Sequence, residues 1–273
     1  RIRQQELMRE KLKMSLPLLK ERFLNRLVLG KVDPASFSIR KEYVGWNDTL
    51  SFYQIVYVQI PDAWSDLDTL AFTDHMKQMI QGSDEIFQNP EENSVLLLQG
   101  SDSKKLAERS VETAKQVFQY AGLMDMDQVS VGIGDVVDTN RQLHRSYDGA
   151  ETAASYSGIL GIAQVLTVDQ VRRKDPVDPS DFNEKVGSLI QSIKEGHRQQ
   201  TGHVLEEIFS YIHEHLISPA EIYHYFNRLH VRLADFLPNI GLSSIELNRA
   251  EPPVQVFHTV KSAAVFLKKW FLK

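Results

Sequence analysis

Residues 129–157 read VSVGIGDVVDTNRQLHRSYDGAETAASYS, and this stretch decides the fold. Apolar residues alternate with small ones at Val129, Val131 and Ile133, which predicts a β-strand. A polar turn follows, and the small residues from Ser146 to Ala154 predict a helix after it. The stretch therefore predicts a strand, a turn and a helix within one domain.

The neighbouring segments supply the rest of a sheet. Ser51 to Ile60, SFYQIVYVQI, is β-branched and aromatic, which predicts a strand buried on both faces. Two apolar runs flank NPEEN, Asn89 to Asn93, and predict a hairpin. The predicted order is strand 51–60, helix 66–80, strands 85–88 and 94–99, a helix ending at 120, strand 129–133, helix 146–154 and strand 164–167. This order predicts an α+β fold with helices packed on a sheet that contains antiparallel strands.

Length and composition limit the class of protein. The 273 residues suit about two domains, and no run approaches the roughly 18 apolar residues that cross a bilayer. Lys plus Arg number 31 against 36 Asp plus Glu, and this net charge of -5 argues against direct binding of nucleic acid. The sequence has no cysteine, which excludes disulfides and is typical of a reducing compartment. We therefore expect a cytoplasmic protein without membrane contact.

The N-terminal segment, Ile2 to Val28, has the pattern of an amphipathic helix. Apolar residues recur there at steps of four and three: Met8, Leu12, Leu16, Leu19, Phe23 and Leu27. Pro17 predicts a kink or two successive helices, and Gly30 is predicted to end the second one. The six apolar residues have two interpretations, a helix docked on its own domain or the seam of a two-chain coiled coil. We favour the coiled coil, and therefore a homodimer.

A second domain is predicted after a linker. RRKDPVDPSD, Arg172 to Asp181, combines two prolines with clustered charges, as linkers do. Beyond it, helical patterns at 182–194, 201–215, 219–236 and 254–273 predict a small helical bundle. We divide the chain into an N-terminal linker helix (1–30), a sheet domain (37–171) and a helical bundle (182–273). Both ends fall inside helical patterns, so we expect the chain to be part of a longer protein.

No group of side chains in the sequence predicts catalysis or metal binding. The histidines of the helical region lack the spacing of metal ligands: His203, His213, His215, His224 and His230. The motif VGIGD, residues 131–135, lacks the third glycine of a phosphate-binding loop, and strand packing explains its two glycines. We therefore predict no enzyme activity, no metal ion and no cofactor.

The strand, turn and helix of residues 129–157 resemble a degenerate form of the GGDEF family, whose active members are diguanylate cyclases. In that family the first strand ends near a metal-binding aspartate, and a hairpin carries Gly-Gly-Asp/Glu-Glu-Phe. Carboxylates at these places hold the Mg²⁺ that bridges nucleotide phosphates. Here Gln59 lies about where the aspartate would be, NPEEN has no glycine pair, and Glu91 and Glu92 are interpreted as a solvated turn. The resemblance thus implies a GGDEF-like domain without cyclase activity.

Four stretches together resemble the middle region of AraC-type response regulators of the YesN kind. They are LLKERFLNRLVLGKVD (18–33), VSVGIGD (129–135), RSYDGAETAASYS (145–157) and the helical segment 182–209 with SLIQSIKEGHRQQTGHVLEEIF. The resemblance implies an upstream receiver or membrane sensor, a cognate histidine kinase and downstream helix-turn-helix motifs, all outside this chain. It predicts a non-catalytic, dimeric region that relays an upstream signal to DNA-binding motifs.

An alternative from another class is a small-molecule sensor of a one-component AraC-type regulator. In that case the GGDEF-like domain binds a nucleotide or a sugar without turning it over. Trp46, Tyr53 and Trp64 are the candidate walls of such a ligand pocket.

Overall fold

A computed structural model describes residues 2–61, 64–124, 129–160, 165–172 and 179–215, together with the isolated positions 221, 224 and 231. Within the first helix, side chains are described from Ser15 onward. Residues 1–157 and 163–170 form one compact unit, and residues 158–162 and 171–273 form a second. The helices predicted at 219–236 and 254–273 lie outside the described residues, apart from the three isolated positions.

The first unit is built on one five-stranded sheet with the strand order β2-β3-β1-β4-β5. The strands are β1 (Phe52–Gln59), β2 (Glu85–Gln88), β3 (Ser94–Gly100), β4 (Ser130–Ile133) and β5 (Val165–Thr167). All neighbouring strands pair antiparallel except β4 and β5, which are parallel. The predicted α+β fold is confirmed, and six consecutive residues of β1 are buried, as expected for a strand covered on both faces.

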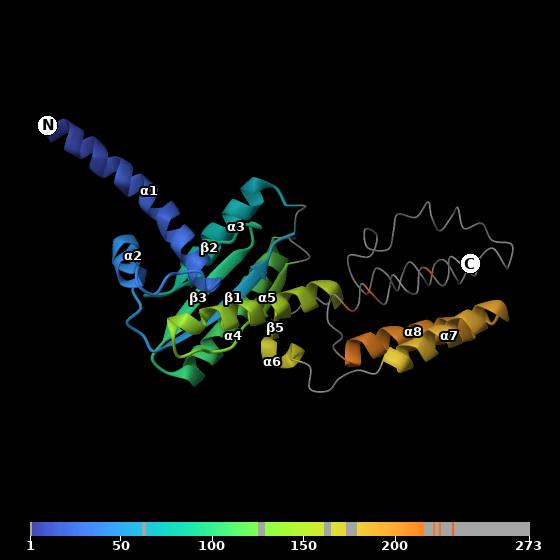
Figure 1. Ribbon diagram of the computed structural model, residues 1–273. Coiled ribbons are helices and arrows are strands. Elements are labelled where there is room, and N and C mark those ends of the chain that lie inside the picture. The colour runs from blue at the N-terminus through green and yellow to red at the C-terminus, as the bar shows by residue number, and fades with distance from the viewer. Residues whose placement is uncertain are drawn as a thin grey trace. The chain divides into compact units, whose positions relative to one another are not determined.

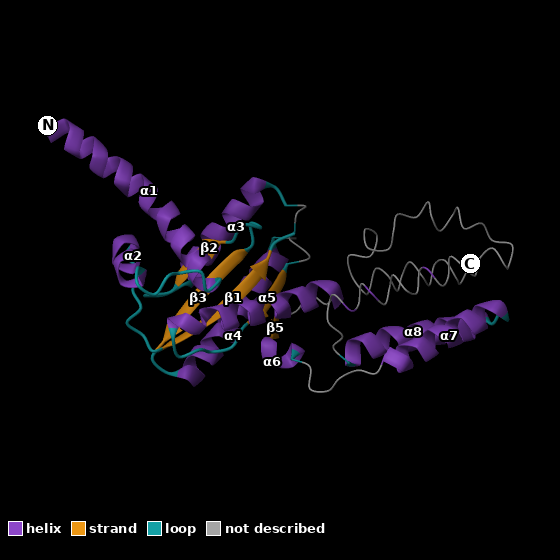
Figure 2. Cartoon of the chain, in the orientation of Figure 1, coloured by secondary structure: helices purple, strands orange, loops and turns teal. Residues whose placement is uncertain are grey.

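Helices cover both faces of this sheet (Figures 1 and 2). The helices between residues 2 and 171 of the described ranges are α1 (Ile2–Val28), α2 (Phe37–Val44), α3 (Asp66–Met79), α4 (Ser103–Leu123), the 3₁₀-helix η1 (Asn140–Gln142), α5 (Leu143–Leu160) and α6 (Val168–Val171). Alternate side chains of β1 divide the core in two. Tyr53, Ile55 and Tyr57 pack with α1 and α5, and Val56 and Val58 pack with α3 and α4. The residues that α1 and α5 bury on the first face are Phe23, Leu24, Leu27, Val28, Leu143, Tyr147, Ala150 and Ala154.

Helix α5 approaches β4 so closely that the strand has no room for side chains on that face. An added Cβ on Gly132 would lie 2.0 Å from the carbonyl oxygen of Ala150, and one on Gly134 would lie 1.8 Å from that of Ser146. These glycines are therefore required by the packing of the helix on the strand. The small residues of α5 serve the same contact, because Ala150 and Ala154 are fully buried against the sheet.

A side chain of α5 also completes the hydrogen bonding of the central strand. The backbone N–H of Ile55 donates to the hydroxyl of Ser146 at 2.9 Å, and Gly134 N–H donates to the Ile55 carbonyl at 3.0 Å. Beyond this point Tyr53 and Val137 exchange two further backbone hydrogen bonds, of 2.8 and 2.9 Å. Ser146 thus accepts from a buried N–H where the β1–β4 ladder is interrupted.

Helix α1 is a single helix from Ile2 to Val28 with Pro17 inside it, so the alternative of two successive helices is corrected. Proline removes one hydrogen-bond donor from the helix, and Pro17 lies at an exposed position. Gly30 ends the helix as predicted. It has a φ of 65°, its N–H donates to the carbonyl of Leu27, and Lys31 N–H donates to that of Arg26.

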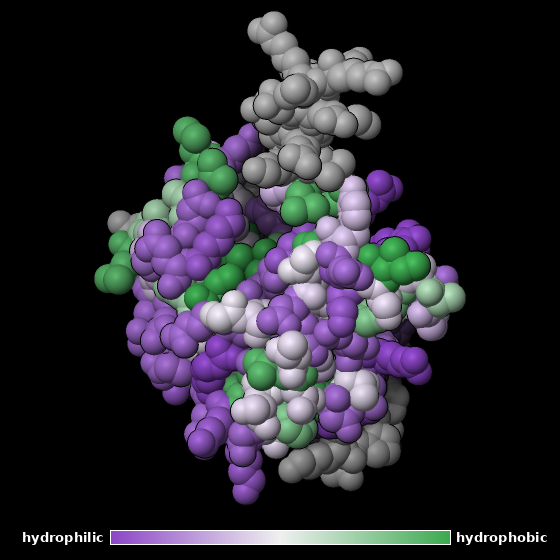
Figure 3. Space-filling model, turned by 90° about the vertical axis from the view of Figure 1, so that its left-hand side faces the viewer, coloured by the Kyte–Doolittle hydropathy of each residue, from purple (hydrophilic) through white to green (hydrophobic). Residues whose placement is uncertain are grey.

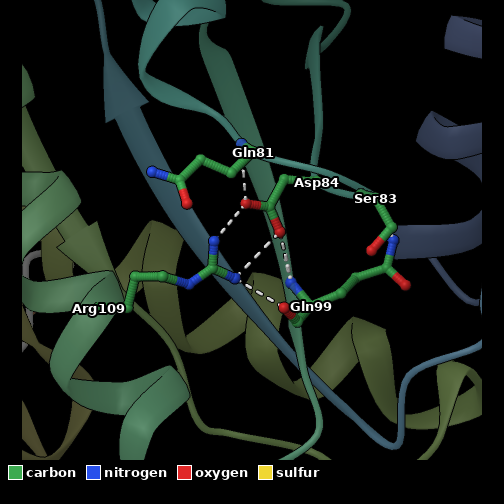
Figure 4. A network of polar contacts seen from close by, with 5 residues as sticks. All are labelled: Gln81, Ser83, Asp84, Gln99 and Arg109. Atoms are coloured by element: carbon green, nitrogen blue, oxygen red, sulfur yellow. Dashed lines mark hydrogen bonds and ion pairs between the residues drawn. The ribbon is translucent and has the colours of Figure 1, made fainter.

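The open end of the β2–β3 hairpin is closed by a buried ion pair (Figure 4). The Asp84 side chain is 1% exposed and pairs with Arg109 of α4 at 2.5 Å. Asp84 also accepts from the backbone N–H groups of Gln99 and Gln81, and Arg109 donates to the carbonyl of Gln99. Because both charged groups have several hydrogen-bond partners, this pair fixes α4 to the hairpin instead of leaving a buried charge unpaired.

The second unit contains a helical hairpin of α7 (Pro179–Lys194) and α8 (Arg198–Glu214). Gly196 turns the chain with a φ of 72°. Residues that face each other across the hairpin are buried: Phe182, Val186, Leu189, Leu205, Ile208 and Ile212. The two helices agree with the first two predicted for the bundle, although both begin about three residues earlier than the apolar pattern indicated.

We expect Gly132→Ala to lower the free energy of unfolding of the first unit by about 3 kcal/mol or more, because the new methyl group meets backbone that cannot move alone. Gly122→Ala is the matched control. An added Cβ on Gly122 meets no atom within 4 Å, so this substitution should leave stability unchanged or raise it by up to about 1 kcal/mol. Urea denaturation followed by tryptophan fluorescence measures both, and equal stabilities would contradict the close contact.

Candidate functional site

The C-terminal part of α1 belongs to the core of the first unit. Phe23 and Leu27 are buried, at 6% and 5% exposure, and Leu19 packs against the same cluster. The prediction of a dimer seam is therefore corrected at Phe23 and Leu27, because these side chains already contact their own domain. Leu16 is half-buried, and the side chains of Met8 and Leu12 lie outside the described residues.

Polar contacts fix the same part of α1 to the edge strand β2. Lys20 pairs with Glu85 at 2.5 Å, and Asn25 Nδ2 donates to the carbonyl of Gln88 at 2.7 Å. Burial raises the pKa of Glu85, and its hydrogen bond and ion pair with Lys20 oppose that shift. The Asn25 contact satisfies a carbonyl group at the edge of the sheet, where strand β2 has a neighbour on one side alone. The helix is thus held by apolar and polar contacts together.

The three aromatic residues predicted as pocket walls do not form one pocket. Trp46 and Tyr53 are buried side by side on the α1 face of the sheet, with ring centroids 6.3 Å apart. Trp64 lies on the opposite face, where its ring packs edge-on against Phe72 at 5.2 Å. The prediction of a shared wall is corrected, because the sheet separates Trp64 from the other two residues.

The end of β1 and the hairpin turn lie next to each other, as the resemblance implied. Gln59 is the exposed last residue of β1, and Glu91 and Glu92 are exposed in the turn. Pro90 follows Asn89, and Glu92 takes a left-handed φ of 63°, which is a conformation that favours glycine. The predicted hairpin and its solvated glutamates are confirmed.

Asn89 organises the hairpin turn from a buried position. Its side-chain oxygen accepts from the N–H groups of Glu91 and Asn93, and its Nδ2 donates to the hydroxyls of Tyr57 and Tyr147, each at 3.1 Å. Asn93, also buried, accepts from the N–H of Ile60 at 2.9 Å. Two asparagine side chains therefore join the turn to the end of β1 and to α5.

The groups around Asn89 have shifted pKa values. Burial is the main reason that the pKa of Tyr57 and that of Tyr147 are raised, so both phenols stay protonated over a wide pH range. Burial also raises the pKa of Glu151 on α5, and the charges of Asp148 and Glu91 raise it further. The site therefore combines two neutral phenols with a carboxyl group on α5 whose pKa is raised by burial and by neighbouring negative charges.

Sequence reasoning missed Asn89, Asn93 and Ser146 as key positions. An asparagine before a proline does signal a turn in which its side chain accepts from the backbone. The sequence gives no sign, however, that Tyr57 and Tyr147 would meet that side chain from residues 32 and 58 positions away. The mutual contact depends on the packing of α5.

Among the described residues, no group of three or more His, Cys, Asp or Glu side chains is arranged to hold a metal ion. None of the helices in the described ranges is long and apolar enough to cross a bilayer.

Comparison with known proteins identifies the sheet domain. Residues 30–156 match the family described as the GGDEF-like domain. This part of the chain is therefore a GGDEF-like domain, in agreement with its mixed five-stranded sheet and its covering helices. A search of curated proteins found no match to the chain.

We expect Asn89→Ala to lower the free energy of unfolding of the GGDEF-like domain by about 3 kcal/mol, because it leaves two backbone N–H groups and two buried hydroxyls without their partner. Glu92→Gly in the same turn is the control. It removes an exposed side chain from a left-handed residue and should change stability by about 1 kcal/mol or less. If urea denaturation gives the two variants the same midpoint, the hairpin does not depend on Asn89.

Proposed function

We propose that this chain is a non-catalytic regulatory region that passes a signal from an upstream domain, through α1 and the GGDEF-like domain, to a DNA-binding domain outside the chain. The docking of α1 carries this proposal. Its last turns contribute Phe23, Leu24 and Leu27 to the core, so a rotation or shift of the helix must repack the sheet. An element that is rigidly coupled at one end and extends beyond the domain at the other is suited to relay (Figure 1).

The hairpin supports a role without catalysis. A diguanylate cyclase needs carboxylates that bring Mg²⁺ to the nucleotide phosphates at the end of the first strand and at the hairpin. Gln59 stands at the strand end, and the side chain of Asn93 bonds the backbone of Ile60 beside it. The turn is occupied by hydrogen bonds within the protein at the place where the active family members contact substrate.

The remaining seam on α1 supports a homodimer. Once Phe23 and Leu27 are assigned to the core, Met8, Leu12 and Leu16 continue the same helical stripe toward the N-terminus. On the face that carries α1 and α2, hydrophobic residues lie in separate patches between hydrophilic ones (Figure 3). This surface favours pairing through the helix over pairing through the face of the domain.

The resemblance to AraC-type response regulators of the YesN kind supports a place in transcriptional control in the cytoplasm. The upstream domain is then a receiver or a membrane sensor that acts with a histidine kinase. A change there would alter the pairing or register of the α1 stripe. Two arrangements within a few kcal/mol of each other suffice for such a relay.

Incubation of the chain with GTP and Mg²⁺ should yield no cyclic dinucleotide and no pyrophosphate above the buffer level, because Gln59 stands in place of the metal-binding aspartate and the turn lacks the glycine pair. An active GGDEF cyclase assayed in parallel by liquid chromatography is the positive control. Product formation by this chain would refute the non-catalytic role.

We expect Met8→Asp combined with Leu12→Asp to convert the dimer to a monomer in sedimentation velocity, because a buried carboxylate in each chain disrupts the seam. Leu18→Asp is the control. Leu18 is 69% exposed and lies off the stripe, so the dimer should persist. A monomeric wild-type chain, or a dimer that survives the double substitution, would refute the seam. Loss of the dimer in the Leu18 variant would place the contact on another face of α1.

A further inference from the structure

A cavity of about 240 Å³ lies where the end of α1, the turn after it and η1 come together. Leu27, Val32, Pro34 and Phe37 form its apolar side. Asn140 and Arg141 form its polar side. The cavity is separate from the hairpin and from the predicted aromatic walls, although the ring of Phe37 lies 6.2 Å from that of Trp46.

Arg141 is the positive charge available to a ligand in this cavity. Its side chain is exposed, and within the described part of the chain its guanidinium has no hydrogen-bond or ion-pair partner. The neighbouring Lys41 is paired with Asp48, and Asp48 also accepts from Asn140 Nδ2 at 3.2 Å. The charge of Lys41 is therefore neutralised inside the protein, and that of Arg141 is not.

The size of the cavity limits the ligand. At about 30 Å³ for each water-sized group, 240 Å³ holds on the order of eight non-hydrogen atoms. A nucleotide would leave most of its atoms outside the cavity. A single guanidinium also matches one negative charge, whereas a phosphomonoester carries nearly two at neutral pH.

We propose that this cavity binds a small monocarboxylate with an apolar body. The carboxylate pairs with the Arg141 guanidinium, and the body of the ligand packs against Leu27, Val32 and Phe37. The planar fork of arginine suits two parallel hydrogen bonds to a carboxylate. The apolar wall then selects an aliphatic or aromatic acid over a polar one such as lactate.

The position of the cavity connects its occupancy to α1. Leu27 belongs to the last turn of the helix, and Gly30 ends the helix at the cavity wall with a left-handed φ of 65°. A ligand that contacts both the end of α1 and η1 stabilises the arrangement in which these two elements are docked together. This coupling rests on the proposed relay function, whereas the binding itself does not.

Titration calorimetry on the whole chain tests the site with 4-methylpentanoate and phenylacetate as probes. We expect dissociation constants of about 0.1 to 5 mM, as suits ligands of this size. Two control compounds should bind at least about tenfold more weakly than these carboxylates. They are lactate and the neutral amide of 4-methylpentanoate. Binding of either carboxylate should shift the tryptophan fluorescence, because Phe37 of the cavity wall packs against Trp46.

Arg141→Gln should weaken carboxylate binding at least about tenfold. Arg145→Gln removes the same charge from an exposed position of α5 outside the cavity and should change binding by less than about twofold. The site is refuted if neither carboxylate binds below about 10 mM, if the two variants bind equally, or if phenyl phosphate binds more tightly than phenylacetate. Sedimentation with and without phenylacetate tests the coupling separately: binding without any change in the dimer refutes the link to α1 and leaves the site intact.

Discussion

The close approach of α5 to β4 is the contact on which the rest of the GGDEF-like domain depends. It is possible because Gly132 and Gly134 have no side chains, and it lets Ser146 complete the hydrogen bonding of β1. The same placement brings Tyr147 to the hairpin and Leu143 to the core beneath α1. The 3₁₀-helix immediately before α5 supplies the polar side of the cavity. One strand–helix contact therefore positions the hairpin, the docked helix and the cavity.

Helix α1 carries one apolar stripe, and part of this stripe lies in the core of the domain. The C-terminal part of the helix lies in the core, and the Lys20–Glu85 ion pair and the Asn25 contact fix it to β2. Toward the N-terminus, the sequence continues the stripe with Leu16, Leu12 and Met8. Because apolar burial is not directional, the same leucine spacing serves an intramolecular core and a helix pair equally well. The proposed relay depends on this continuity.

Two buried asparagines hold the hairpin of the GGDEF-like domain. Asn89 and Asn93 form hydrogen bonds to the backbone, and Asn89 also donates to two tyrosines. The turn thereby becomes part of the domain's stability. Glu92 holds a left-handed conformation without the help of a glycine, which these surrounding hydrogen bonds compensate.

The sequence by itself determined the strands, most of the helices and the hairpin, because alternation and helical spacing are local properties of the chain. Only the tertiary structure decided which partner Phe23 and Leu27 contact, and that Trp46 and Trp64 lie on opposite faces of the sheet. Only the tertiary structure, likewise, buried Asn89 beneath two tyrosines. The sequence indicates which side chains need to be buried or hydrogen-bonded. It does not indicate which residues they contact, because those residues come from distant positions in the chain.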